Sequence, residues 1–142
     1  MPTRTASATW TGGLRGGKGT FTGESGAVGG EYSFGSRFAN AGGTNPEELL
    51  AAADAACYSM ALAGALERAG TPPDRVDTQA ACTIEKVGDA FQITTMTLTV
   101  RASVPGADRD TFKDLAETTK DSCIVSAALL GNVHIEVDAQ LV

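Results

Sequence analysis

Short runs of alternating apolar and polar residues occupy the first forty positions and are separated by glycine pairs. Alternation bounded by glycine is typical of short antiparallel strands that follow one another as a meander. The sequence predicts three such strands, over residues 5–10, 19–22 and 31–34. The neighbouring segment from Tyr32 to Phe38 is also strand-like in composition.

An apolar run, LLAAADAACYSMALAGAL at residues 49–66, comes next and predicts one long helix. Asn45 can cap free backbone amides, Pro46 suits the first helical position, and the two glutamates after it favour the positive end of the helix dipole. Gly70 and the proline pair after it favour an end near that point. We therefore expect the helix over residues 46–69.

The apolar run approaches the length of a membrane span. Asp54 lies in its middle, alanine is far commoner than leucine or phenylalanine, and no basic flank precedes it. These features favour a buried core helix over a membrane helix. The first ten residues lack the apolar segment of a secretory signal, so we expect a cytoplasmic protein with no membrane association.

The remaining half of the chain contains two long alternating segments, two helical segments and a final alternating segment. We expect these over residues 76–86, 91–104, 108–120, 122–130 and 133–141. A Gly88-Asp89 turn would join the two long strands as an antiparallel hairpin, Asp108 would cap the first helix, and Ser122 would cap the second. The order of elements predicts an α+β fold and a single domain over residues 1–142.

Charge and histidine content narrow the function. The formal net charge of −6 argues against binding to nucleic acid, which requires clustered lysine and arginine. The single histidine, His134, cannot supply a multi-histidine metal centre, and no Cys/His spacing matches zinc. We therefore expect neither a metal site nor a nucleic-acid partner.

Three cysteines are the candidate reactive groups. Cys57 lies in the apolar helix and is expected to be buried, whereas Cys123 follows a charged stretch and is expected to be more accessible. They are 66 positions apart, which excludes a local CxxC or zinc unit, so only the fold could bring them together. Such a pair favours redox chemistry over a structural disulfide in a reducing compartment. Cys82 lies in an alternating strand, where packing is its expected role.

Several neighbours bear on thiol reactivity. A guanidinium from Arg37 would lower the pKa of the Cys57 thiol, and Glu47 could hold that arginine in a bidentate pair. The first turn of a short helix would stabilise a Cys123 thiolate. Asp54, one turn before Cys57, would raise the thiol's pKa unless it is paired or points away. From residue type alone, a packing role for each cysteine stays open.

The segment GTNPEELLAAADAACYSMAL, with Ser36-Arg37-Phe38 before it and SCIVSAALLGNVHIEV after it, resembles the OsmC/Ohr family. The opening residues TWTGGLRGGKGTFTGESG are similar to the OsmC branch, so the resemblance covers essentially the whole chain. It implies an OsmC-like fold, with antiparallel sheets around a long central helix, and an intertwined homodimer with active sites at the subunit interface.

The same resemblance implies a thiol-dependent peroxidase of oxidative and osmotic stress defence that reduces organic hydroperoxides and, more weakly, H₂O₂. Cys57 corresponds to the family's nucleophile, Cys123 to the resolving cysteine that forms a disulfide with it, Arg37 to the activating arginine and Glu47 to that arginine's partner. No cofactor is implied, and an external dithiol such as a lipoyl group would reopen the disulfide. Apolar neighbours of the nucleophile, among them Met60 and Leu62, would suit an alkyl peroxide.

Two other functions fit the same residues. The fold could bind an apolar ligand without catalysis, as a stress protein, or a Cys57–Cys123 disulfide could act as a redox sensor. The presence of Arg37 and Glu47 together with both cysteines favours the enzyme.

Overall fold

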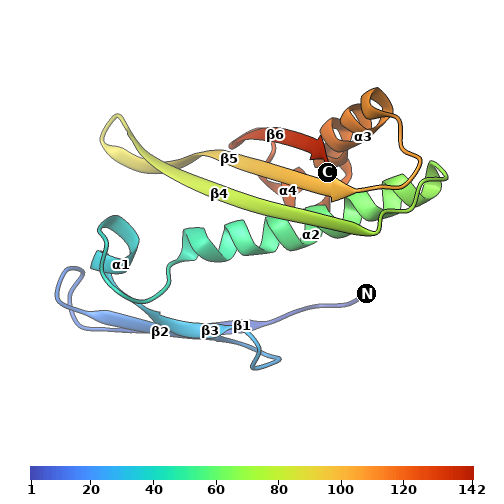
Figure 1. Cartoon of the computed structure of the whole chain (residues 1–142). Coiled ribbons are helices and arrows are strands. Elements are labelled where there is room, and N and C mark those ends of the chain that lie inside the picture. Colours follow the sequence, from blue (N-terminus) through green and yellow to red (C-terminus); the bar gives the residue numbers. More distant parts are fainter. The chain divides into compact units, whose positions relative to one another are not determined.

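The computed structural model describes residues 1–142, which divide into two compact units, Met1–Leu49 and Leu50–Val142 (Figure 1). The elements of the first are β1 (Ala6–Thr11), β2 (Lys18–Gly23), β3 (Gly29–Tyr32) and α1 (Phe34–Phe38). Helix α2 (Pro46–Arg68) begins at the end of the first unit and continues into the second, which also holds β4 (Arg75–Val87), β5 (Ala90–Ser103), α3 (Arg109–Ser122), α4 (Ile124–Leu129) and β6 (His134–Leu141).

The sheet of the first unit is the predicted antiparallel meander, in the order β1-β2-β3. Gly19 of β2 lies beneath the rings of Trp10 and Tyr32, whose centroids are 5.6 Å apart. A Cβ at Gly19 would come within 2.4 Å of the Tyr32 ring, so only glycine allows this close packing. The third strand ends at Tyr32, two residues earlier than predicted.

The strand-like assignment of the segment from Tyr32 to Phe38 is wrong, because most of it forms the short helix α1. Ser33 caps this helix: its side chain accepts a hydrogen bond from the Ser36 N–H at 3.0 Å, and the Ser36 hydroxyl accepts one from the Ser33 N–H at 2.8 Å. This reciprocal capping outweighs the strand preference of the flanking aromatic residues. Arg37 therefore stands on a helical turn.

Helix α2 follows its prediction within one residue. The Asn45 side chain accepts a hydrogen bond from the Glu48 N–H at 2.8 Å, as a capping residue does. At the other end Gly70 adopts a φ of 86°, and the N–H of Thr71 donates to the Leu66 carbonyl at 2.9 Å. This left-handed turn is the expected helix stop.

The sheet of the second unit, in the order β4-β5-β6, is mixed. Strands β4 and β5 form the predicted antiparallel hairpin, with Gly88 at a φ of 63° in its turn. Strand β6 pairs with β5 in parallel, which departs from the expectation of antiparallel sheets alone. Helices α3 and α4 supply the long crossover connection that a parallel pair requires.

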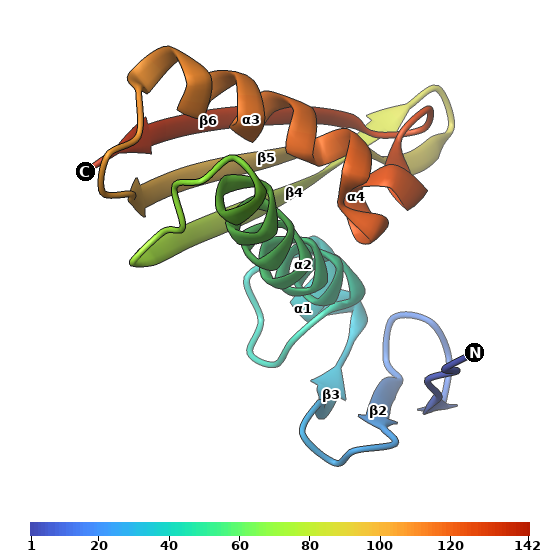
Figure 2. The same cartoon turned by 90° about the vertical axis from the view of Figure 1, so that its right-hand side faces the viewer.

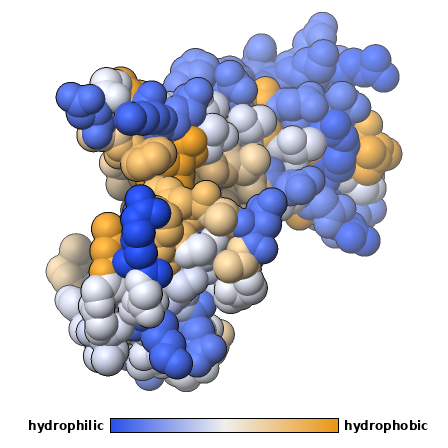
Figure 3. All heavy atoms as spheres, turned by 90° about the vertical axis from the view of Figure 1, so that its left-hand side faces the viewer, coloured by the Kyte–Doolittle hydropathy of each residue, from blue (hydrophilic) through white to orange (hydrophobic).

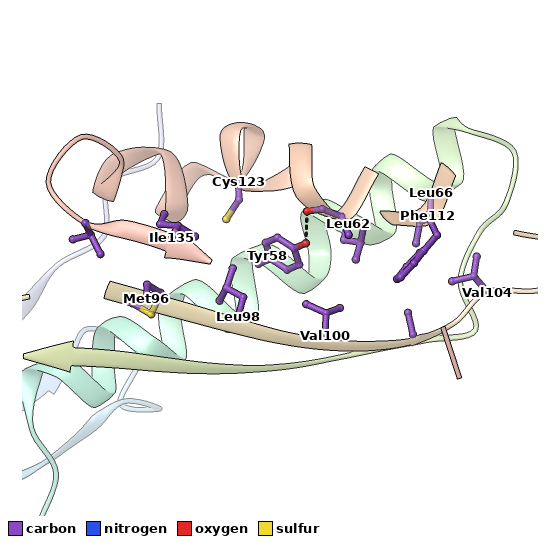
Figure 4. Close-up of a cluster of buried hydrophobic side chains, with 13 residues drawn as sticks. Tyr58, Leu62, Leu66, Met96, Leu98, Val100, Val104, Phe112, Cys123 and Ile135 are labelled. Carbon is purple, nitrogen blue, oxygen red and sulfur yellow. Dashed lines mark hydrogen bonds between the residues drawn. The ribbon is translucent and has the colours of Figure 1, made fainter. Parts of the chain in front are cut away.

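Helices α2 and α3 cover one face of the β4-β5-β6 sheet (Figure 2). The residues between them form the core, and Figure 4 shows Tyr58, Leu62 and Leu66 of α2 facing Leu98 and Val100 of β5. Helix α2 is long and apolar enough to cross a membrane by length and composition alone. Tyr58, Leu62 and Leu66 of α2 are nevertheless fully buried and pack into this core, as the side chains of a core helix do.

Apolar residues also reach the surface, where Figure 3 shows them in patches among hydrophilic ones. On α2 the exposed residues include Ala52, Ala56 and Met60, which follow one another at a spacing of four. Met60 is 76% exposed. A helix that is apolar on all sides is usually covered on all sides.

Two boundaries near Cys123 differ from prediction. Asp108 caps α3 as expected, and its side chain accepts a hydrogen bond from the Thr111 N–H at 2.9 Å. Ser122, however, is the last residue of α3 and does not cap α4. Cys123 itself is the residue at the junction, outside the first turn of α4.

Candidate active site

Cys57 and Cys123 are brought together within the second unit. Cys57 projects from α2 and is partly buried, and Cys123 lies at the junction of α3 and α4 with no exposed surface. Both carry free thiols, and Cys57 is close enough to Cys123 to act on the pKa of the Cys123 thiol. In Figure 4 the Cys123 side chain points into the core above Leu98. The fold thus joins two thiols that are 66 positions apart in sequence.

The expected accessibility of the two thiols is reversed. Cys123 was the thiol expected to be more accessible, yet it is the fully buried one, because the turn between α3 and α4 directs its side chain into the core. Cys57 keeps partial exposure although it stands in the apolar helix. The partly exposed thiol is therefore the one that an external oxidant can reach.

Asp54 completes a buried polar cluster with Cys123. Its Oδ1 accepts hydrogen bonds from the Ser126 hydroxyl at 2.6 Å and from the Cys123 thiol at 3.7 Å. The Asp54 and Ser126 side chains have no exposed surface. One of the two carboxyl oxygens is thus paired within this cluster.

The Cys123 thiol is held in its protonated form. Burial raises the pKa of this thiol, and contacts with the Ser126 hydroxyl and backbone amide oppose that effect. The nearby Cys57 thiol, and negative charge on it, raise the pKa of Cys123 further. The sequence predicted that the start of α4 would lower the pKa of Cys123 and favour its thiolate. This prediction is wrong, because the loss of water around the buried thiol raises the pKa more than the Ser126 hydroxyl and amide lower it.

Arg37 and Glu47 form an ion pair within the first unit. Arg37 donates two hydrogen bonds to Glu47 Oε1, from Nε at 2.9 Å and from Nη2 at 2.7 Å. The expected bidentate pairing differs in detail, because one carboxylate oxygen accepts both bonds and the buried Oε2 has no partner. Glu47 is 5% exposed, so it provides a fixed anchor for the guanidinium.

The guanidinium of Arg37 keeps donors for another acceptor. Its side chain is 43% exposed, and Nη1 takes no part in the bonds to Glu47. A guanidinium carries five N–H donors in a rigid fork. The side of Arg37 turned away from Glu47 can therefore bind an anionic or peroxide oxygen.

Other sequence-predicted residues take different places. Leu62 was expected to be an apolar neighbour of Cys57 that contacts the peroxide. It is instead fully buried in the core. Cys82 packs against the same core, as predicted. His134 is exposed, 3.4 Å from Glu136, and no group of three or more His, Cys, Asp or Glu side chains forms a metal-binding arrangement.

Sequence reasoning did not assign Asp54 or Ser126 to the site. A charged residue in the middle of an alanine-rich run was the available signal, because a buried carboxyl group needs hydrogen-bond partners. Its partners could not be identified, because Ser126 lies 72 positions away and Cys123 lies 69.

The family model for OsmC-like proteins matches residues 39–138. The chain belongs to the OsmC-like protein family. It is 43% identical over 135 residues to the peroxiredoxin OsmC of Escherichia coli strain K12, covering 94% of this chain and 93% of that protein. The solved structure of the organic hydroperoxide resistance protein OhrB of Bacillus subtilis is 28% identical, with a TM-score of 0.71 and coverage of 96% of this chain and 98% of that one.

A third comparison confirms the fold. An organic hydroperoxide resistance protein OsmC from Legionella pneumophila superimposes with a TM-score of 0.73 at 21% identity, covering 96% of each chain. The α+β architecture with two small sheets and a long helix is therefore the fold of OsmC and Ohr proteins. Cys57 and Cys123 lie within the region that the family model matches, whereas Arg37 lies just before it.

Proposed function

We propose that this peroxidase-type enzyme reduces organic hydroperoxides through Cys57 and Cys123. The Cys57 thiolate attacks the distal peroxide oxygen and the O–O bond breaks, so that Cys57 becomes a sulfenic acid. The alkoxide leaves and takes a proton from solvent to become the alcohol. Cys123 then attacks the sulfenic sulfur, which gives a disulfide and water. A dithiol reopens the disulfide by thiol exchange and restores both thiols.

The proximity of the two thiols, seen in the effect of Cys57 on the pKa of Cys123, is the observation that carries this function. A nucleophile must be reachable, and Cys57 is the thiol with exposed surface. A resolving thiol must meet a sulfenic acid before a second peroxide does, and Cys123 is held beside Cys57 in its protonated form. The two environments therefore suit two different roles.

Arg37 and Glu47 are proposed to activate the peroxide step. A guanidinium near the nucleophile favours its thiolate and stabilises charge that develops on the leaving alkoxide. The free donors of Arg37 suit that role, and the buried Glu47 anchor suits its orientation. Membership in the OsmC-like family supports the proposal that the Arg37–Glu47 pair acts beside Cys57.

The residues around Cys57 favour an organic hydroperoxide as the substrate. Apolar residues around Cys57 on α2, including Ala61, favour an alkyl group over bulk water. The names of the relatives, a peroxiredoxin and an organic hydroperoxide resistance protein, support that substrate class. We propose a dithiol such as a lipoyl group as the reductant, no bound cofactor, and action in the cytoplasm under oxidative or osmotic stress.

A homodimer is proposed as the working form. All six residues of β1 are exposed, and α2 exposes Ala52, Ala56 and Met60 along one side. A second copy that covered these surfaces would bury apolar area that a single chain leaves in water. Sedimentation of Met60→Glu beside the unmodified protein tests this: we expect a dimer that the charged side chain weakens, and a monomeric unmodified protein would contradict it.

Peroxide turnover with matched cysteine variants tests the function. Cumene hydroperoxide and H₂O₂ are supplied separately with a dithiol reductant to the unmodified protein, Cys57→Ser, Cys123→Ser and Cys82→Ala. We expect faster turnover of the organic peroxide, no turnover in Cys57→Ser, and impaired dithiol-dependent turnover in Cys123→Ser. Cys82→Ala, which removes the thiol outside the pair, should keep its activity.

Other outcomes identify the alternatives. Equal inertness of the unmodified protein and Cys57→Ser would overturn the peroxidase and favour a module that binds an apolar ligand. Reduction of a single equivalent of peroxide, with no further turnover in excess dithiol, would instead indicate a redox sensor.

A further inference from the structure

Asp54 is a fully buried carboxyl group that the thiol chemistry above does not use. It stands one turn before Cys57 on α2, and its side chain has no exposed surface. Taking a carboxyl group out of water costs free energy that hydrogen bonds must offset. A small apolar residue would fill this place in an alanine-rich helix more easily, so the cluster around Asp54 calls for a chemical explanation.

The two oxygens of Asp54 differ in their surroundings. Oδ1 accepts hydrogen bonds from the Ser126 hydroxyl at 2.6 Å and from the Cys123 thiol at 3.7 Å. Oδ2 is equally buried but has no hydrogen-bond partner. Buried polar atoms are rarely left unpaired in native proteins. The carboxyl group therefore contacts the thiol directly and retains a free oxygen.

Disulfide formation requires a base at this place. Cys123 must lose its proton to attack the sulfenic acid of Cys57, because a thiolate is the nucleophile and a thiol is not. Burial raises the pKa of the Cys123 thiol, and its side chain has no surface exposed to solvent. Bulk water is therefore a poor acceptor for that proton, and the acceptor should belong to the cluster itself.

Few groups in the cluster can act as that base. Cys57 is already oxidised to the sulfenic acid at this stage. The Ser126 hydroxyl donates a hydrogen bond to Asp54, and a hydroxyl is not basic near neutral pH. The Tyr58 hydroxyl is a protonated phenol that donates a hydrogen bond to the Ala116 carbonyl, so it is not a base either. The Asp54 carboxylate is the group that both contacts the thiol and can accept a proton.

We propose that Asp54 is the general base of the disulfide-forming step. As the S–S bond forms, the Cys123 proton moves to the Asp54 carboxylate and the S–O bond of the Cys57 sulfenic acid breaks. Cys123 sulfur is oxidised and Cys57 sulfur is reduced. The departing hydroxide takes the proton from Asp54 and leaves as water, so the carboxylate is regenerated and no other reactant is needed.

The same group would serve the reductive half of the cycle. When a dithiol attacks the Cys57 side of the disulfide, Cys123 departs as a thiolate in a buried place. The proton that the attacking dithiol loses can pass through the Asp54 carboxylate to that thiolate, which then leaves as a neutral thiol. Ser126 would fix Oδ1 in the orientation that reaches Cys123, and is therefore a positioning residue.

Because this role presupposes the disulfide step of the proposed function, the test separates the two half-steps. Reduced protein is mixed with one equivalent of cumene hydroperoxide, and dimedone capture with mass spectrometry follows the sulfenic acid over time. In Asp54→Asn the amide keeps an acceptor oxygen for Ser126 but cannot take a proton. We expect Cys57 oxidation within about twofold of the unmodified rate, and disulfide formation slowed roughly 100-fold, the usual size of general-base effects.

Asp114→Asn is the matched control, because it removes a carboxylate from the exposed side of α3 and should change neither step. Disulfide formation in Asp54→Asn at the unmodified rate would overturn the role of Asp54 alone. If the unmodified protein forms no sulfenic acid at all, the proposed function fails instead. The two failures are thus distinguishable.

A second variant guards against misfolding of Asp54→Asn. Asp54→Ala leaves space where the carboxylate stood, and added formate can supply the missing base. We expect formate to restore disulfide formation, and formamide, of similar shape but without a basic oxygen, to leave it slow. Rescue by both or by neither would show that Asp54 fills space and does not transfer the proton.

Discussion

Tyr58→Phe tests how the core holds the two thiol-bearing segments together. The Tyr58 side chain is fully buried, and its hydroxyl donates a hydrogen bond to the Ala116 carbonyl at 2.5 Å, which links α2 to α3 (Figure 4). The change removes that hydroxyl and keeps the ring. Ala116 lies in the middle of α3, where its carbonyl retains its intrahelical partner, so no acceptor is left without a bond.

The expected cost at neutral pH is that of one hydrogen bond. A net loss of about 1 kcal/mol in the free energy of unfolding corresponds to a melting temperature about 3 °C lower for a chain of this size. Urea denaturation of the reduced proteins at neutral pH measures it. Cys57 oxidation should stay close to the unmodified rate, because Tyr58 contacts the helices and does not take part in the peroxide step.

Alkaline pH should reverse this difference. Burial, followed by the charges of Glu117, Cys123 and Asp54, raises the pKa of Tyr58 above its ordinary value of about 10. Above that value the unfolded chain loses the phenol proton while the folded chain keeps it, so the folded state loses stability as pH rises. The loss reaches about 1.4 kcal/mol near pH 11, and the two proteins should have equal stability near pH 10.6.

Denaturation of both proteins across this range, with the tyrosinate absorbance followed in parallel, provides the assay. Effects of other titrating groups cancel in the difference between the two proteins. A difference that stays near 1 kcal/mol from neutral pH to about pH 11 would refute the buried, hydrogen-bonded phenol.

Three further changes test other parts of the structure. Glu47→Gln removes the charge that anchors Arg37, and stopped-flow kinetics should show Cys57 oxidation slowed about tenfold; an unchanged rate would contradict the anchoring role. Leu62→Ala opens a cavity in the core and should lower the free energy of unfolding by about 2–5 kcal/mol in urea denaturation, whereas a smaller loss would indicate a loosely packed site. Asp108→Ala removes the cap of α3 and should lower the melting temperature at neutral pH. Hydrogen bonds from Thr111 lower the pKa of Asp108, so the difference should vanish as acid protonates it in both states, and a difference that persists in acid would argue against capping.

Most local structure could be predicted from the sequence, because its signals are local. Asn45 and Gly70 mark the ends of α2 through capping and a left-handed turn, and Gly88 marks the β4-β5 turn. The error in α1 has a local cause as well. The Ser33–Ser36 capping pair lacks the glutamate that usually identifies a capping box, and the aromatic residues around it favour a strand.

The residues of the site could be predicted from the sequence, but their burial and hydrogen-bond partners could not. The two cysteines were identified, yet their exposures were reversed, because burial of Cys123 depends on a turn direction between α3 and α4 that no local pattern specifies. The partners of Asp54 were out of reach for a similar reason, since hydrogen bonds across more than 60 positions exist only in the folded chain. The parallel pairing of β6 likewise depends on how a crossover packs.

The most direct test of the central claim is a disulfide map after oxidation by one equivalent of cumene hydroperoxide. Non-reducing proteolysis and mass spectrometry should find one link, between Cys57 and Cys123, with Cys82 still a thiol, and no link should form in Cys57→Ser. An unoxidised protein, or a link that involves Cys82 in place of either partner, would contradict the account.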